Sequence, residues 1–222
     1  MIPVITIDGP SGAGKGTIAQ MLALELDWNI LDSGALYRTL AYFMKGNSIN
    51  LENFVENYDL LRQRFKVSFD PGTPGEPVKV FFENEDITSI IRTEEMAKLT
   101  SALAGESIIR EFIKPCQREF MTAPGLVADG RDMGTVIFSD AKHKIFLTAT
   151  MEERAKRRQT QLKRQGLEVN MRTLLQELEE RDKMDTEREH SPLIPADDSV
   201  TIDTTNLNPE GVVKEIKTYL KQ

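Results

Sequence analysis

Five short apolar segments recur along the chain, and stretches with helical spacing separate them. They are Val4–Asp8, Asn29–Asp32, Leu126–Asp129, Lys144–Ala149 and Val200–Asp203. Continuous apolar runs of this length are typical of strands buried on both faces, and parallel strands need crossover helices between them. The pattern therefore predicts an α/β protein with a five-stranded parallel sheet and helices on both faces.

A different pattern interrupts this order between residues 64 and 91. Phe65–Phe69 and Val78–Phe82 alternate in polarity, and a Pro/Gly-rich turn at Asp70–Pro77 joins them. Alternation on both sides of such a turn is typical of an antiparallel hairpin. We expect one domain over 1–222 that carries an inserted antiparallel subdomain at about 64–91, extending toward residue 110.

A glycine-rich segment follows the first predicted strand and leads into an amphipathic helix. It consists of Gly9, Pro10, Ser11, Gly12, Ala13, Gly14, Lys15, Gly16 and Thr17. Glycines let backbone N–H groups approach an anion, and the start of the helix adds a positive dipole end. Lys15 supplies a mobile cation for the β- and γ-phosphates. A glycine-rich turn without function is the alternative, but strand, loop, lysine and helix together favour a phosphate-binding loop for ATP.

This loop departs from the general pattern G-x-x-x-x-G-K-[ST], because Gly16 stands where the magnesium-binding hydroxyl is expected. Its form resembles the loop of nucleoside monophosphate kinases such as adenylate kinase. The resemblance implies that Thr17, one position later, takes the magnesium side. Asp129, acting through water, is the second candidate for the metal.

Three predicted strand ends carry polar residues that would meet at one edge of the sheet. These segments are Gly9–Thr17, Asp32–Gly34 and Asp129–Asp132. Ser33 and Arg38 are therefore candidates for binding a monophosphate, and Arg131 and Asp132 supply a cation and a carboxylate side by side at the same edge. Taken singly, a solvated arginine or a salt-bridged turn explains each pair equally well.

Two further groups of arginines have helical spacing. Arg181, Asp185 and Arg188 share one face if the helix expected from Asn170 continues, and Arg154 and Arg158 share another. The second pair belongs to an acid-free run of six basic residues before Gly166, for which a solvated helix face is the alternative. Arginines opposite a phosphate loop are what phosphoryl transfer needs, so we expect a mobile lid at about 154–169 whose Arg154 and Arg158 bind ATP.

Composition limits the remaining function classes. The net charge of −7 argues against a protein that coats nucleic acid. A single cysteine, Cys116, excludes an intrachain disulfide, and with only His143 and His190 no Cys/His zinc cluster can form. No signal peptide and no run of eighteen apolar residues is evident. We expect a cytoplasmic monomer whose partners are small nucleotides, not membranes or nucleic-acid polymers.

The combined motifs resemble those of the bacterial cytidylate kinases over essentially the whole chain. They are GPSGAGKGT at 9–17, LDSGALYR at 31–38, ADGRDMGTVIF at 128–138, KIFLTA at 144–149 and the ERD…D…R spacing at 180–188. The GRDMGT segment is the specific part, and the inserted hairpin resembles the enlarged monophosphate-binding domain of these enzymes. The resemblance implies that Arg38, Arg131 and Arg188 hold the acceptor phosphate. It further implies that Ser101, Arg110 and Asp132 read the base and that Arg181 and Asp185 reach the sugar.

The sequence thus predicts a P-loop kinase that moves the γ-phosphoryl group of ATP to CMP, and to dCMP, with Mg²⁺. Lys15, Arg131, Arg158 and Arg188 are the expected catalytic cations, and no catalytic base is needed because the second pKa of the acceptor phosphate is about 6. Another acceptor, such as AMP, UMP or shikimate, is the nearest alternative. A GTP-dependent switch would need D-x-x-G and N-K-x-D strings, and neither occurs. A third alternative is a structural module that binds a nucleotide without turnover, but it would give the basic lid and the GRDMGT segment no role.

Overall fold

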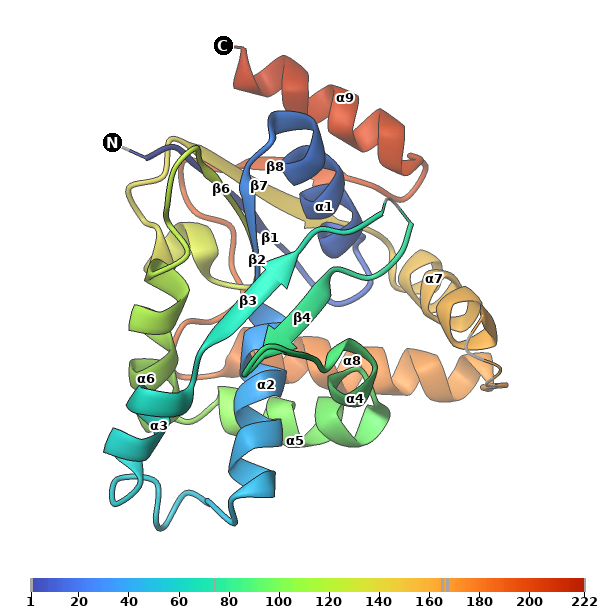
Figure 1. The fold of residues 1–222 in the computed structure, drawn as a ribbon. Coiled ribbons are helices and arrows are strands. Elements are labelled where there is room, and N and C mark those ends of the chain that lie inside the picture. The colour runs from blue at the N-terminus through green and yellow to red at the C-terminus, as the bar shows by residue number, and fades with distance from the viewer. Residues whose placement is uncertain (1, 74, 165, 167, 222) are drawn as a thin grey trace.

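The computed structural model describes residues 2–73, 75–164, 166 and 168–221. Its main sheet has five parallel strands, which are β1 (Val4–Asp8), β2 (Asn29–Asp32), β6 (Leu126–Asp129), β7 (His143–Thr148) and β8 (Val200–Asp203). Their order in space is β2-β6-β1-β7-β8 (Figure 1). The predicted parallel sheet is confirmed. Only β7 differs from its predicted bounds. It begins and ends one residue earlier than predicted, and His143 already pairs with Ile5 of β1.

Different helices cover the two faces of this sheet. They are α1 (Lys15–Leu26) and α9 (Pro209–Leu220) on one face, and α2 (Ser33–Gly46) and α6 (Ser107–Arg118) on the other. Successive strand residues point to opposite faces, so Val127 packs with the first pair while Leu126 and Ala128 pack with the second. Because β6 is buried on both faces, its sequence shows an apolar run instead of an alternation.

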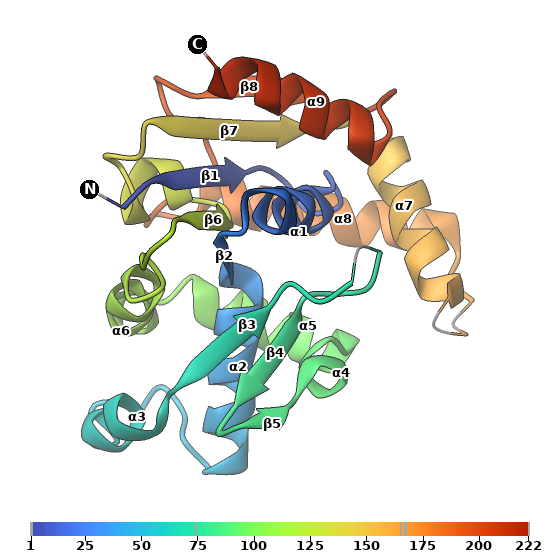
Figure 2. The same ribbon diagram turned by 45° about the horizontal axis from the view of Figure 1, so that its top comes forward.

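A second, antiparallel sheet stands apart from the first (Figure 2). It consists of β3 (Val67–Asp70), β4 (Lys79–Phe82) and β5 (Glu85–Asp86), with α3 (Tyr58–Arg64), α4 (Thr88–Ile91) and α5 (Glu94–Ala104) around it. The predicted hairpin is present and gains the short third strand β5. Pro74, at its turn, lies outside the described residues. Phe82 packs edge to face with Phe43 of α2, ring centroids 5.5 Å apart, which seats this sheet on α2.

Helices α7 (Met151–Arg164) and α8 (Met171–Glu187) form a pair at the carboxyl ends of β1 and β7 (Figure 2). Ala155, Leu162, Leu174 and Leu178 make a small core between them. The side chain of Asn170 caps α8 by accepting a 2.8 Å hydrogen bond from the Arg172 N–H. The predicted lid spans this turn, and its residues 165 and 167 lie outside the described residues. Within the described part of the chain, no helix combines the length and apolar character needed to cross a bilayer.

Candidate active site

The glycine-rich segment wraps around the carboxyl end of β1 in a conformation that depends on its glycines. Gly9 has φ +146°, and a Cβ there would lie 2.1 Å from the carbonyl oxygen of Leu147. Gly14 is the N-cap residue of α1, with φ +94°, and has no side chain that could cap the helix. The first N–H groups of α1 are thus not capped by a side chain and can serve an anion.

Contacts from β8 and α7 hold the glycine-rich segment in place. The Arg154 guanidinium is buried and donates to the carbonyl oxygens of Ser11 and Ala149, each over 3.1 Å. The same group pairs with Asp182 of α8 at 2.6 Å. The Thr204 hydroxyl donates to the carbonyl oxygen of Ala13 over 3.1 Å. Arg154, predicted to contact ATP from a lid, therefore connects the loop to α8 in this structure.

Lys15, at the start of α1, and Asp129, at the end of β6, interact electrostatically beside the glycine-rich segment. The Lys15 ammonium donates to the carbonyl oxygen of Pro10 over 2.9 Å. Burial lowers the pKa of Lys15, and Arg131 lowers it further, whereas Asp129 raises it. Burial raises the pKa of Asp129, and Lys15 opposes that rise. Each group thus supports the charge of the other in a site that would otherwise disfavour both charges.

The loop after β6 places Arg131 and Asp132 at the same edge, since Asp129 is in register with both Ile7 of β1 and Asp32 of β2. Asp132 is only 3% exposed and forms an ion pair with Arg110 of α6. Arg110 also donates to the carbonyl oxygen of Ala104 over 3.1 Å. Two of the residues that the resemblance assigns to the base, Asp132 and Arg110, therefore lie in direct contact.

A second cluster joins this loop to the end of α8. Arg131 donates to Asp185 over 2.7 Å, and Arg188 lies 3.8 Å from the same carboxylate. Burial raises the pKa of Asp185, but Arg131 and its hydrogen bond outweigh burial and hold the pKa below its usual value. Burial, then Arg131, lower the pKa of Arg181 to about 10. One carboxylate thus holds several cations whose mutual repulsion would favour binding of an anion.

Arg188 lies one residue beyond the helix that was expected to contain it, as the extended C-cap of α8. Its Nε donates to the carbonyl oxygen of Ser191 over 2.5 Å. Its Nη2 is buried and has no hydrogen-bond partner among the described residues. That nitrogen is a donor still available to a ligand.

Ser33 and Ser101, both predicted to contact the acceptor, have different surroundings. Ser33 begins α2, is buried, and accepts a 2.8 Å hydrogen bond from the Gln117 side chain. Its own O–H can then donate elsewhere. The Ser101 hydroxyl donates to the carbonyl oxygen of Ala97 within α5, over 3.0 Å. Only the oxygen lone pairs of Ser101 remain for another partner.

Arg38 and Arg158 reach the site from opposite elements. Arg38 of α2 donates to the carbonyl oxygen of Ile91 over 2.8 Å. Arg158 of α7 forms an ion pair with Glu94 of α5, which bridges the lid helix and the inserted segment. Burial lowers the pKa of Arg38, Asp32 opposes this, and Arg158 adds to the lowering. The two arginines therefore share one electrostatic environment.

Comparison with known proteins decides the family. A family model described as cytidylate kinase matches residues 5–222. The cytidylate kinase of Shewanella frigidimarina (strain NCIMB 400) is 51% identical over 220 residues, covering 99% of this chain and 96% of that relative. The cytidylate kinase of Stutzerimonas stutzeri (strain A1501) is 48% identical over 215 residues, covering 97% and 93%. The chain belongs to the cytidylate kinase family. As a member of this family it is a nucleoside monophosphate kinase, a transferase with ATP as phosphoryl donor.

Phosphoryl transfer from ATP commonly uses divalent cations that bridge the β- and γ-phosphates. In this protein the hydroxyl of Thr17 is exposed, and Asp129 is half-buried. A Cβ at Gly16 would lie 3.4 Å from the Asp129 carboxylate, so the missing side chain leaves space in front of it. Hydroxyl and carboxylate oxygens are ligands that suit Mg²⁺, which keeps several waters and needs few protein ligands. The residues present therefore fit a magnesium ion bound together with phosphates.

Three supporting residues of this cytidylate kinase family member were not predicted. Asp8 accepts hydrogen bonds from the Met133 and Gly134 N–H groups, and Gln117 donates to Ser33. Gln20 of α1 donates to the carbonyl oxygens of Pro71 and Glu76 at the hairpin turn, over 2.5 and 2.9 Å. The only available signal was the position of Asp8 as a polar residue that ends an apolar strand.

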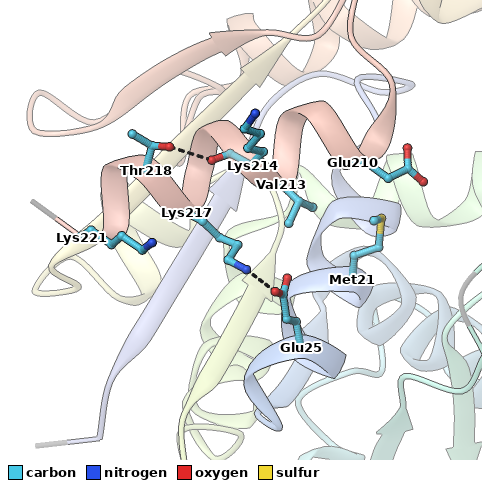
Figure 3. A pocket seen from close by; sticks show the side chains of 8 residues that line it. All are labelled: Met21, Glu25, Glu210, Val213, Lys214, Lys217, Thr218 and Lys221. Atoms are coloured by element: carbon cyan, nitrogen blue, oxygen red, sulfur yellow. Dashed lines mark hydrogen bonds and ion pairs between the residues drawn. The ribbon is translucent and has the colours of Figure 1, made fainter.

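A pocket of about 480 Å³ lies away from these groups, between α1 and α9 (Figure 3). Its lining residues are Met21, Glu25, Glu210, Val213, Lys214, Lys217, Thr218 and Lys221. Lys217 pairs with Glu25 across it, and none of the lining residues belongs to the predicted site. The pocket is therefore separate from the candidate site, which lies at the carboxyl ends of the strands, where open parallel sheets bind ligands.

Proposed function

We propose that this kinase transfers the γ-phosphoryl group of ATP to CMP, and also to dCMP, by direct in-line displacement. The observation that carries the proposal is the buried Asp132, paired with Arg110 and placed next to Arg131 at the edge that holds the phosphate loop. A carboxylate accepts from the exocyclic amino group of cytosine and repels the carbonyl oxygen of uracil. Asp132 therefore provides a physical basis for choosing cytosine.

The donor half of the proposed site is the segment Gly9–Thr17, where the N–H groups of the loop and the Lys15 ammonium would bind the ATP phosphates. Thr17 and Asp129 would hold Mg²⁺, which would supply charge neutralisation between the β- and γ-phosphates. Lys15 interacts with the charges of Asp129 and Arg131. Its ammonium would stabilise the negative charge that develops on the leaving oxygen of ADP in the transition state.

The acceptor half comprises the arginines that surround Asp185. Arg131 and Arg188, together with Arg38 from α2, would hold the acceptor phosphate, while Asp185 and Arg181 would contact the sugar. The unpaired Nη2 of Arg188 supports this assignment, because a buried donor without a partner is satisfied when a phosphate oxygen arrives. At neutral pH that phosphate is largely a dianion, so alignment and charge neutralisation suffice and no general base is required.

The two smaller units have proposed roles in closing the site. The segment from about 64 to 91, extending toward 110, would form the monophosphate-binding subdomain, and 154–169 would form the lid. The ion pair between Arg158 and Glu94 supports this, since it already joins the two units across the crevice. When ATP binds, Arg158 would exchange Glu94 for phosphate oxygens, and Arg154 would keep the loop attached to α8.

A coupled assay of ADP release tests the substrate assignment. Purified protein is supplied with ATP, Mg²⁺ and, in separate reactions, CMP, dCMP, UMP, AMP or shikimate. We expect the highest kcat/KM for CMP, measurable turnover of dCMP, and lower values for the other three acceptors. A higher kcat/KM for UMP, AMP or shikimate would refute CMP as the substrate while leaving the kinase assignment intact.

A further inference from the structure

Asp8 is a buried carboxylate that the proposed reaction does not use. It ends β1, is 5% exposed, and lies directly before Gly9 of the phosphate loop. One of its oxygens accepts a 2.9 Å hydrogen bond from the Met133 N–H, and the other accepts a 2.8 Å bond from the Gly134 N–H. A single side chain thus satisfies two neighbouring backbone donors that start the π-helical turn η1 (Met133–Ile137).

These bonds complete a two-sided attachment of the loop after β6. On the near side, the Gly130 N–H donates to the carbonyl oxygen of Ile7 over 3.0 Å. On the far side, Asp8 holds Met133 and Gly134. The two residues between these anchors are Arg131 and Asp132, which are assigned above to the acceptor.

The turn that begins at Met133 also packs closely against β1. A Cβ at Gly134 would lie 2.9 Å from the Thr6 hydroxyl oxygen, so only glycine lets the turn approach β1 this far. Asp132 itself lacks a side-chain capping bond to the turn that follows it. The side chain of Asp132 is therefore left for Arg110 and a ligand, because Asp8 performs the capping in its place.

Burial of this carboxylate is unfavourable for stability. Asp8 forms no ion pair with another described residue; burial and the charge of Asp132 oppose its ionisation, and the charge of Lys15 and the two backbone hydrogen bonds only partly offset them. Isolated buried charges are costly unless they are well hydrogen-bonded. A neutral asparagine would present a single oxygen acceptor, whereas the carboxylate presents two. Conflicts with local stability of this kind are expected where a function needs the geometry.

We propose that Asp8 is a positioning residue that fixes Arg131 and Asp132 relative to the phosphate loop, so that the donor and acceptor halves of the site share one anchor at the end of β1. The proposal rests on the proposed function, because the roles of Arg131 and Asp132 come from there. Asp8 acts through the loop and does not touch substrate.

The test compares Asp8→Asn with Thr6→Val, a matched control on the same face of β1 whose hydroxyl has no hydrogen-bond partner among the described residues. In Asp8→Asn one backbone N–H faces an amide donor. Because one buried hydrogen bond is lost, we expect the KM for CMP to rise about tenfold and the ratio of kcat/KM for CMP to that for UMP to fall. The KM for ATP should change less than about twofold. Thr6→Val should behave as wild type.

Hydrogen exchange at residues 130–137 gives a readout that does not depend on activity. We expect faster exchange of the Met133 and Gly134 amides in Asp8→Asn than in Thr6→Val. Equal exchange in the two variants would overturn the proposal, as would a KM for ATP that rises as much as the KM for CMP. Unchanged acceptor kinetics with a lower melting temperature would reduce Asp8 to a purely structural residue and also overturn it.

A failure of the proposed function gives a different result. If wild-type protein prefers another monophosphate, the comparison of acceptor KM with ATP KM is made with that monophosphate, and the role of Asp8 is still decided. If Asp8→Asn does not fold, Asp8→Ser, whose hydroxyl can accept from one N–H, replaces it with the same expected direction.

Discussion

Arg131 and Asp185 are joined by a 2.7 Å charge-assisted hydrogen bond between the loop after β6 and the last turns of α8. Both side chains are largely buried, at 19% and 18% exposed. Asp185 is also the counter-charge of Arg188, 3.8 Å away, so it keeps two arginines in one place. An ion pair between segments 54 residues apart therefore holds together the cluster that we propose as the acceptor site.

Replacement of Asp185 by Asn should expose this dependence. The arginines would lose the carboxylate that offsets their repulsion, so we expect the free energy of unfolding to fall by about 1–3 kcal/mol and the KM for CMP to rise. Thermal denaturation and steady-state kinetics measure the two effects. Glu179→Gln, an exposed change on the same helix, is the control. Equal melting temperatures and KM values in the two variants would show that the pair has no such role.

Lys15 should contribute to rate more than to stability. Its buried ammonium acts on phosphate charge, and one such electrostatic contact is worth roughly 10²–10³ in kcat. We therefore expect Lys15→Ala to lose at least that factor while circular dichroism remains native. Near-normal turnover in the variant would remove the glycine-rich loop from the mechanism.

The sequence predicted those parts of the site that have a local signature. Gly9–Thr17, the end of β2 and the GRDMG segment each follow a buried apolar strand, and parallel topology brings such ends together. Long-range partners had no such signature. Gln20 binds backbone carbonyl oxygens at the hairpin turn, and nothing in the residues of a turn reports which side chain its carbonyls will meet.

The basic run in α7 shows a second limit. Spacing predicted that Arg154 and Arg158 lie on one face, but spacing does not say what that face contacts. In the fold, Arg154 is 5% exposed and connects the phosphate loop to Asp182, while Arg158 meets Glu94 across the crevice. Nearby positions on one helix can thus have entirely different partners.

Arg158 should affect turnover more than acceptor binding. A lid cation matters most when negative charge shifts in the transition state, so Arg158→Ala should lower kcat by a larger factor than it raises the KM for CMP. Lys156→Ala removes an exposed cation from the same helix and is the matched control. A defect confined to the KM for CMP would place Arg158 on the acceptor side.

Asp8 should give the protein a distinct dependence of stability on pH. Burial raises its pKa to about 6, despite the lowering effect of the Gly134 and Met133 hydrogen bonds, whereas an unfolded aspartate titrates near about 3.9. Folding therefore takes up a proton between these values, and the contribution of Asp8 is fully present below pH ~3.9 and lost as pH rises through ~6.

Urea unfolding between pH 4 and 7 measures this effect as a difference between wild type and Asp8→Asn. The free energy of unfolding of wild type, relative to the variant, should fall by roughly 2–3 kcal/mol over that range. Carboxylates that do not interact with Asp8 cancel in the difference. A difference that stays constant with pH would mean that Asp8 is ionised in the folded protein throughout.

Asp132 offers the sharpest test of substrate choice. A carboxylate accepts from the amino group of cytosine and repels the carbonyl oxygen of uracil, and sites that pair a polar group reject the analogue that leaves it unpaired. In Asp132→Asn the amide can turn either a donor or an acceptor toward the base, so kcat/KM for CMP should fall and the CMP-over-UMP ratio should narrow. Arg110 would lose its ion pair at the same time. Arg110→Lys, which keeps a positive charge beside the carboxylate, separates the two effects, because the preference for CMP should then persist at lower efficiency. An unchanged ratio in Asp132→Asn would mean that Asp132 orients Arg131 or binds sugar and that another group reads the base.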